Sequence, residues 1–370
     1  MPETIQRDIR TLADAPTKQE LSEALERANR PPLSLVGESG DSVLVLPHGG
    51  RILGLYSSAS DKNFLWTSAA ISSAELAREH FGSDRWCNSG GDRTWLAPEI
   101  DFFYPHYPDT GRQYLQPRQL DPGRFVASRT PTQIMLENSL AIHSFRRGWT
   151  QSIRVRKTVN MVANPLTVCG LERPAAELEF AGYQLHTSLE LLDASAAEVE
   201  IGIWNLLQLP GGGEMIVPTY RPTTPVVYFG DIPSGDLRTE PRCVRYRMSA
   251  PNEQKIGIDA LALTGRAGYV LEDNDNPTVA SLVVRNYASN LVGPYVDVPT
   301  HSPERGGHAF QACNIDADYL GHFAELEYHA PAIGGGNGLR RSDDVSQVFA
   351  YRGPREAIAQ AAQALLGVEI

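Results

Sequence analysis

The sequence predicts an all-β protein, mainly antiparallel and built as a large sandwich. Stretches of alternating apolar and polar residues follow one another along the chain, and 26 prolines and 32 glycines in 370 residues supply the turns between them. The chain shows no regular exchange of strand and helix patterns, which would indicate a parallel sheet. Clear helical periodicity is confined to the two ends.

The helices expected at the two ends belong to the same domain as the sandwich. Residues 17–29 combine a capping box, Thr17 with Glu20, with apolar residues at helical spacing. Residues 354–366 begin with proline, which suits the first position of a helix, and carry one apolar face. The expected organisation is a helical extension over 1–35, the β-sandwich over 36–353 and a C-terminal helix over 354–370 packed on the sandwich.

Between these ends the pattern is one of short strands. In residues 152–161 the apolar Ile153 and Val155 point to one side, while Arg154 and Arg156 point to the other. A short helix is expected over 72–80 and a long ordered loop over 98–122. Strands are expected over 42–47, 49–55, 63–66, 152–161, 184–192, 199–209, 214–218, 226–229, 269–272, 280–287 and 321–330.

Charge and composition exclude several classes of protein. The formal net charge of −11 argues against general nucleic-acid binding, which needs clustered lysines and arginines. The first ten residues lack the apolar segment of a secretory signal, and no apolar run approaches the roughly 20 residues that cross a bilayer. We therefore expect a cytoplasmic protein with no nucleic-acid or membrane partner, and a homodimer is left open. The four cysteines, Cys87, Cys169, Cys243 and Cys313, are expected to be mostly buried thiols.

Residues 87–99 are the stretch most suggestive of a binding site. Two adjacent glycines allow unusual backbone conformations, and Asp92, Arg93, Trp95 and Glu99 follow directly. Charge beside an aromatic face suits a sugar, which has hydroxyls at its rim and an apolar C–H face for an indole to cover. The alternative is a tight hairpin whose tryptophan is in the core and whose charges are solvated.

Several stretches resemble the galactose mutarotase-like proteins. Residues 48–55, His-Gly-Gly-Arg-Ile-Leu-Gly-Leu, and the following Asn63-Phe-Leu-Trp are similar to the opening of that superfamily, where an Asn and an aromatic residue lie near the sugar cleft. Residues 90–99, 204–208 and 323–331 are similar to a poorly characterised bacterial branch of it. The resemblance implies a β-supersandwich whose concave sheet holds a carbohydrate, with aldose 1-epimerase, hydrolase, lyase and pure binding among the activities. His186 stands nearest to the mid-chain catalytic His of true aldose 1-epimerases, in a different local context.

The late strand carries the strongest chemical pattern. With a period of two, Glu325, Glu327 and His329 share one face, which places a general acid and a general base on one sheet surface. Mutarotation needs such a pair, and the resemblance places the catalytic Glu on a late strand. Glu327 is the preferred base, and His329 or His186 the acid. The alternative is a polar strand face turned to water.

Other candidates complete the expected site. Arg93, Arg154 and Arg156 would clamp hydroxyls or a carboxylate, and Trp95 would be the platform. The further substrate-binding candidates are Asp92, Asn63, Gln208 and His301. The leading function is sugar binding with acid/base catalysis such as aldose epimerisation. The alternatives are a lyase or hydrolase acting on an acidic oligosaccharide, with Glu99 and Glu327 as a hydrolytic pair, and a non-catalytic sugar-binding protein. No cofactor is expected, and no metal, because the histidines lack close metal-binding spacing.

Overall fold

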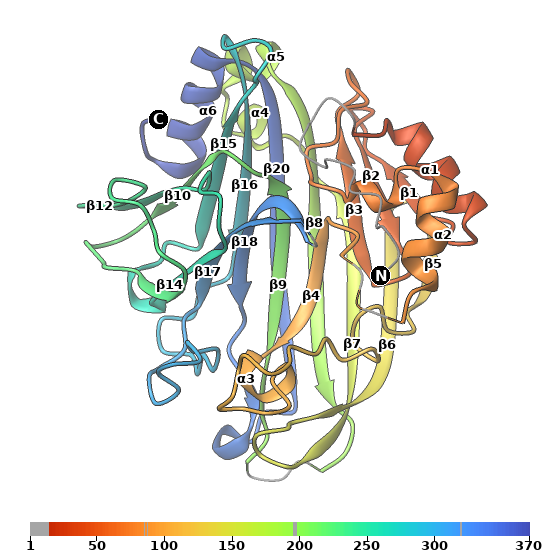
Figure 1. Ribbon diagram of the computed structural model, residues 1–370. Helices are drawn as coiled ribbons and strands as arrows, with labels where there is room; N and C mark the ends of the chain where they lie inside the picture. Colours follow the sequence, from red (N-terminus) through yellow and green to blue (C-terminus); the bar gives the residue numbers. More distant parts are fainter. Residues whose placement is uncertain (1–14, 85, 87, 195–197, 319) are drawn as a thin grey trace.

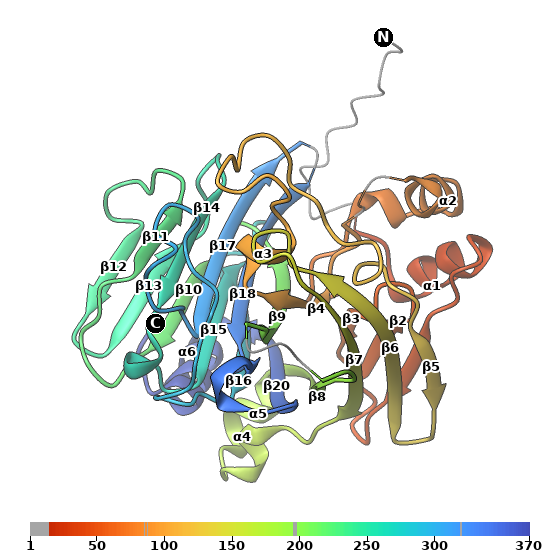
Figure 2. The same ribbon diagram turned by 90° about the horizontal axis from the view of Figure 1, so that it is seen from below.

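The computed structural model describes residues 15–84, 86, 88–194, 198–318 and 320–370. Two sheets, each of ten strands, stack face to face, and the strand pairings within them are antiparallel. Figure 2 shows these sheets as two layers, with β4, β9 and β18 in one and β8, β16 and β20 in the other. The expected fold class, a mainly antiparallel β-sandwich with short helices at its N- and C-terminal ends, is confirmed.

The first sheet carries the candidate site on its outer, concave side. Its strand order is β1-β2-β3-β4-β9-β18-β17-β14-β11, and β19 pairs with β9. The strands are β1 (Leu33–Val36), β2 (Ser42–Leu46), β3 (Arg51–Tyr56), β4 (Asp92–Ala97), β9 (Glu200–Pro210), β11 (Val226–Phe229), β14 (Gln254–Ile258), β17 (Phe310–Ala317), β18 (Gly321–His329) and β19 (Ile333–Gly334).

The second sheet supports the first. Its order is β12-β13-β10-β15-β16-β20-β8-β7-β6-β5. The strands are β5 (Val126–Arg129), β6 (Gln133–His143), β7 (Thr150–Met161), β8 (Glu179–Leu191), β10 (Glu214–Pro218), β12 (Leu237–Glu240), β13 (Cys243–Arg247), β15 (Arg266–Glu272), β16 (Val279–Tyr287) and β20 (Arg341–Pro354).

Helices cover the flanks of the sandwich. They are α1 (Lys18–Arg27), α2 (Ala74–Gly82), α3 (Glu99–Phe102), α4 (Pro165–Val168), α5 (Glu172–Glu177) and α6 (Arg355–Leu366), with single 3-10 turns η2 (Ala69–Ile71), η3 (Ala260–Ala262) and η4 (Gly335–Asn337). Figure 1 shows α1 and α2 on one flank and α6 on the opposite one. The capping box of Thr17 and Glu20 forms as expected at the start of α1. None of the helices in the described ranges has the length and apolar character needed to cross a bilayer.

The main core lies between the two sheets. Leu207 of β9 and Leu326 of β18 belong to one buried apolar cluster with Leu185 of β8 and Val348 of β20. Because successive side chains of a strand point to opposite faces, the neighbours of Leu207 and Leu326 point away from this core. The same alternation turns the intervening residues of the first sheet toward its concave side. On the outer face of the second sheet, α6 packs over a separate apolar cluster.

The structure differs from the sequence-based expectations at several elements. Residues 63–66 form no strand, because the side chain of Asn63 accepts hydrogen bonds from the main-chain N–H groups of Leu55 and Leu65 and so takes the place of a strand partner. The mid-chain helices α4 and α5 were not expected, although Asn164 caps α4 ahead of a proline. Cys243 and Cys313 are buried free thiols and Cys169 is exposed, whereas Cys87 lies outside the described residues.

Candidate functional site

A large cleft lies on the concave side of the first sheet. It is part of a cavity of about 2860 Å³ that continues to Val270 of β15 and Ile358 of α6. The strands β4, β9, β18, β17 and β14 line its floor, because each presents alternate side chains to this side. The floor residues include Arg93, Trp95, Trp204, Leu206, Lys255, Cys313, Phe323, Glu325 and Glu327, and Glu99 of α3 stands at the edge.

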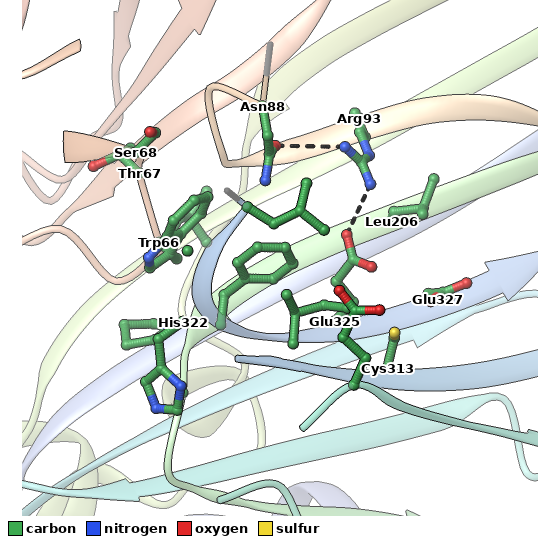
Figure 3. A pocket seen from close by; sticks show the side chains of 18 of the residues that line it. Trp66, Thr67, Ser68, Asn88, Arg93, Leu206, Cys313, His322, Glu325 and Glu327 are labelled. Atoms are coloured by element: carbon green, nitrogen blue, oxygen red, sulfur yellow. Dashed lines mark hydrogen bonds and ion pairs between the residues drawn. The ribbon is translucent and has the colours of Figure 1, made fainter. Parts of the chain in front are cut away.

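The first part of the site is a buried ion pair between β4 and β18. Nη2 of Arg93 lies 3.0 Å from Oε1 of Glu325, and both side chains are less than a tenth exposed. Nε2 of Gln208 donates to the same oxygen at 2.8 Å. Figure 3 shows Arg93 between Asn88 and Glu325, with Glu327 and Cys313 nearby. Both donors reach Oε1, so Oε2 is the oxygen of Glu325 that can receive a ligand hydroxyl.

An aromatic wall supports this ion pair from behind. The guanidinium carbon of Arg93 lies 3.9 Å from the ring centroid of Trp95. Asp121 accepts hydrogen bonds from the indole N–H groups of both Trp95 and Trp86, at 2.9 and 3.2 Å. It also pairs with Arg51 at 2.8 Å. Burial would raise the pKa of Asp121, but Arg51, Arg93 and the indoles lower it below its ordinary value, so Asp121 is an ionised anchor for the wall.

The second part of the site is a lysine between two carboxylates. Nζ of Lys255 lies 3.2 Å from Oε2 of Glu327 and 3.7 Å from Oε2 of Glu99. The indole N–H of Trp204 donates to Glu327 at 2.8 Å, and the hydroxyl of Tyr114 donates to Glu99 at 2.6 Å. Lys255 also lies over the ring of Trp204, 4.5 Å from its centroid. This geometry holds both carboxylates in place on the cleft surface.

The buried carboxylates around Lys255 cannot all be ionised without a large cost in free energy. Burial raises the pKa of Glu327 to about 8, because the neighbouring Glu325 and Glu99 add to the effect and Lys255 offsets only part of it. Burial also raises the pKa of Glu99. For Lys255, burial alone would lower the pKa, but Glu327 and Glu99 raise it well above its ordinary value, so the amine keeps its charge. Three carboxylates therefore face two cations, which favours a proton on Glu327 at neutral pH.

His329 shares the strand face of Glu327 but lies outside the cleft lining. Its ring stacks on Trp204 at 5.5 Å and 20°, and the residue is 2% exposed. Burial lowers the pKa of His329 well below its ordinary value, so the ring is neutral. Neither ring nitrogen has a hydrogen-bond partner within the described part of the chain. His329 thus packs against Trp204 and does not join the carboxylates that line the cleft.

Several residues expected at the site lie on the second sheet or in loops. His186 is on β8, with its side chain 40% exposed and 3.3 Å from Asp343. Arg154 and Arg156 of β7 pair with surface carboxylates of neighbouring strands. His301 is exposed in a loop. The structure does not bring these four side chains to the carboxylates of the cleft.

Asp92 occupies the opposite face of β4 from Arg93. It is fully buried between the sheets, where it pairs with Arg285 at 3.1 Å and accepts a hydrogen bond from the hydroxyl of Tyr183 at 2.7 Å. Asn63 lies at the cleft edge, and its side chain forms hydrogen bonds with the main chain of Leu53 and Leu55 in β3. Asp92 therefore stabilises the contact between the sheets and does not reach the cleft.

Cys313, Glu325 and Glu327 are the described side chains that come within metal-ligand range of one another. One ligand atom from each lies within 4.8 Å of the other two. Each carboxylate already pairs with a cation, and burial, followed by the nearby Glu325, raises the pKa of Cys313 well above its ordinary value. A metal would need these ligands free and the thiol deprotonated.

Lys255 and Asp121 belong to the site but were not singled out in the sequence. Lys255 lies in Gln-Lys-Ile-Gly-Ile, where Ile256 and Ile258 point to the core, so the alternation places Lys255 on the other face. The sequence signal that could have identified Lys255 is a lysine within a short strand of apolar residues. Asp121 ends a proline-rich loop and had no local pattern to mark it.

Comparison with known proteins gives a family and two distant structural neighbours. The chain matches none of the curated proteins. A GalM/aldose epimerase homologue from C. elegans is 10% identical, with a TM-score of 0.42, over 88% of this chain and 99% of that one. A galactose 1-epimerase from Lactobacillus acidophilus NCFM is 8% identical, with a TM-score of 0.44, over 87% of this chain and 94% of that one. At these values no activity is assigned from the likeness. A family model matches residues 19–370, and the chain belongs to that family of unknown function (DUF6786).

Proposed function

We propose that this protein is a carbohydrate-active enzyme that binds a neutral sugar in the concave cleft and transfers protons with its carboxyl groups. The observation that carries the proposal is the convergence of Glu99, Glu325 and Glu327 with two cations beside buried indoles. A sugar offers hydroxyls to the charged groups and an apolar face to an exposed ring such as Tyr114, because Trp95 and Trp204 are almost fully buried. Epimerisation of the sugar at its anomeric carbon needs one proton donor and one proton acceptor, and it is the reaction that these carboxyl groups fit best.

The roles follow from the proton balance. Glu327, with a pKa raised to about 8, holds a proton at neutral pH and would protonate the ring oxygen as the sugar opens. Glu325, paired with Arg93, would take the proton of the anomeric hydroxyl on its free oxygen. Rotation about the C1–C2 bond of the open-chain aldehyde then presents its other face, and ring closure on that face reverses both proton transfers. This assignment makes Glu327 the acid of the ring-opening step, where the sequence favoured it as the base.

The alternative of an acidic oligosaccharide has less support. Recognition of a uronate needs a cation that is not already neutralised. Arg93 and Lys255 both pair with carboxylates in the cleft, and Arg154, Arg156 and Arg285 lie on the second sheet. The space beside the carboxylates therefore suits a neutral sugar unit, while Arg118 and Arg247 line other parts of the cavity. Hydrolysis by Glu99 and Glu327 is the second candidate function, because both side chains face the same space across Lys255. Sugar binding without turnover is the remaining alternative.

Anomeric exchange measured by NMR on a panel of neutral aldoses tests the proposal. The wild-type chain is expected to exchange the anomers faster than the spontaneous rate. Glu327→Gln should lower the catalysed rate by roughly 10²–10⁴-fold, the usual contribution of a general acid, whereas Glu190→Gln on the second sheet serves as a matched control and should keep it. Sugar binding without any acceleration would show a non-catalytic protein, and absence of binding to every aldose would refute the proposal.

A further inference from the structure

The cleft is much larger than one sugar requires. Pockets for small molecules usually measure about 300–1,000 Å³, whereas the cavity that includes this cleft measures about 2860 Å³ and also reaches Glu214 of β10, Val270 of β15 and Ile358 of α6. Its lining extends from Ala70 beside α2, across the carboxylates, to Thr300 in the loop beyond β16. A monosaccharide on Glu325 and Glu327 would leave most of this surface uncovered.

An aromatic surface lies at one end of the carboxylate cluster. Trp66 is half-buried and packs on Phe323, with 4.5 Å between the ring centroids. Gly321 makes this possible, because a Cβ there would lie 2.5 Å from the indole. Ile315 extends the apolar surface. Figure 3 shows Trp66 on the side of the pocket away from Glu327, with Thr67 and Ser68 next to it. An indole with hydroxyls at its edge is a suitable platform for a pyranose ring.

A second aromatic surface lies at the other end. The rings of Tyr104 and Tyr114 are 5.1 Å apart and both line the cleft. Tyr114 is 39% exposed and its hydroxyl reaches Glu99, which faces Glu327 across Lys255. These tyrosines therefore stand beyond Glu327, whereas Trp66 stands beyond Glu325.

The strand geometry separates the two surfaces by more than one ring. Phe323 and Glu327 are four residues apart on β18, which corresponds to about 13 Å at roughly 3.3 Å per residue. Trp66 packs on Phe323 at one end of this span, and Tyr114 contacts Glu99, which lies across Lys255 from Glu327, at the other. A single pyranose on the carboxylates cannot cover both aromatic surfaces.

We propose that the cleft binds a neutral oligosaccharide, with sugar units on Trp66 at one end and on Tyr104 and Tyr114 at the other, and the reacting unit over Glu325 and Glu327. This inference rests on the proposed function and adds the length of its substrate. Where the unit over the carboxylates is the reducing end, its free anomeric hydroxyl allows the proposed epimerisation. Where that unit lies within the chain, its anomeric carbon is held in a glycosidic bond, and the reaction open to Glu99 and Glu327 is hydrolysis of that bond.

The test is binding of a glycan array that carries neutral and uronate-containing chains of one to six units, followed by calorimetry with the best chain and its shorter forms. Affinity is expected to rise at least about tenfold from one unit to four. Trp66→Ala and, independently, Tyr104→Ala should each weaken the longer chain about tenfold and leave the single sugar unchanged. Tyr220→Ala, an exposed aromatic outside the cleft lining, should change neither.

The outcomes separate the two proposals. Equal affinity for one and four units, or platform variants without effect on the long chain, would overturn the inference while leaving a monosaccharide enzyme intact. Preferential binding of uronate chains would overturn the neutral character of the ligand. Binding of no glycan at any length would overturn both the inference and the proposed function.

Discussion

The proton held by Glu327 makes the stability of the protein depend on pH in a defined direction. Burial raises the pKa of Glu327 to about 8 from an ordinary value of 4.5. A carboxyl whose pKa is raised on folding contributes stability that is fully present below the ordinary pKa and is lost as the pH rises through the folded value. Between these two values the folded chain binds about one proton more than the unfolded chain.

Replacing Glu327 with glutamine removes this dependence, because an amide does not titrate. The free energy of unfolding of Glu327→Gln relative to wild type should therefore increase by about 1.4 kcal/mol for each pH unit. From about pH 5 to about pH 7.5 the total is about 3 kcal/mol in favour of the variant. The residue is 1% exposed, so solvent does not screen the effect.

Urea unfolding of both proteins at four pH values across this range measures the difference. The control is Glu177→Gln, which removes an exposed carboxylate from α5 and should give a difference that stays flat with pH. A flat line for Glu327→Gln as well would refute the reasoning. It would mean that Lys255 keeps Glu327 ionised in the folded protein throughout, and the acid role proposed for it would fall.

Three further changes test the site and its support. Arg93→Met leaves the carboxylate of Glu325 buried without its cation and should lower the free energy of unfolding by about 3–5 kcal/mol, and adding Glu325→Gln should restore part of it in urea titrations. Gly91→Ala places a Cβ 2.2 Å from a main-chain oxygen at a φ of +78° and should cost at least about 2 kcal/mol, unlike Gly111→Ala in open space, as thermal unfolding will show. Asp92→Asn weakens a buried ion pair between the sheets by about 3 kcal/mol, and calorimetry should find unchanged sugar affinity.

The pairing of Glu325 and Glu327 on one face could be predicted because it depends only on the period of a strand. Residues 321–330 alternate clearly, and β18 forms over nearly the same range. The same rule would have separated Asp92 from Arg93, but residues 90–99 were interpreted as a turn that presents all its charges together. In the structure these residues enter β4, and adjacent side chains point to opposite sides.

The partners of the charged groups could not be predicted. Lys255 meets Glu327 across β17, and Arg51 meets Asp121 from another part of the chain. Such contacts depend on which strands become neighbours, and local sequence carries no record of strand order. Arg154 and Arg156 of β7 point to solvent because the first sheet covers the other face of β7. Which face is covered depends on how the two sheets pack, and the local sequence does not show it.

The order of strands in the first sheet also governs when the cleft can form. Arg93 and Glu325 are 232 residues apart in the chain. The strand β9 lies between their strands in the sheet but is far from both residues in the sequence. Contacts over such separations close large loops and form slowly. The cleft floor of a nascent chain is incomplete until β18 has been synthesised, since the pairs Arg93–Glu325 and Lys255–Glu327 each need a residue from that strand. The three carboxylates of the cleft therefore come together only in the finished molecule, and a chain that ends before β18 would lack Glu325 and Glu327.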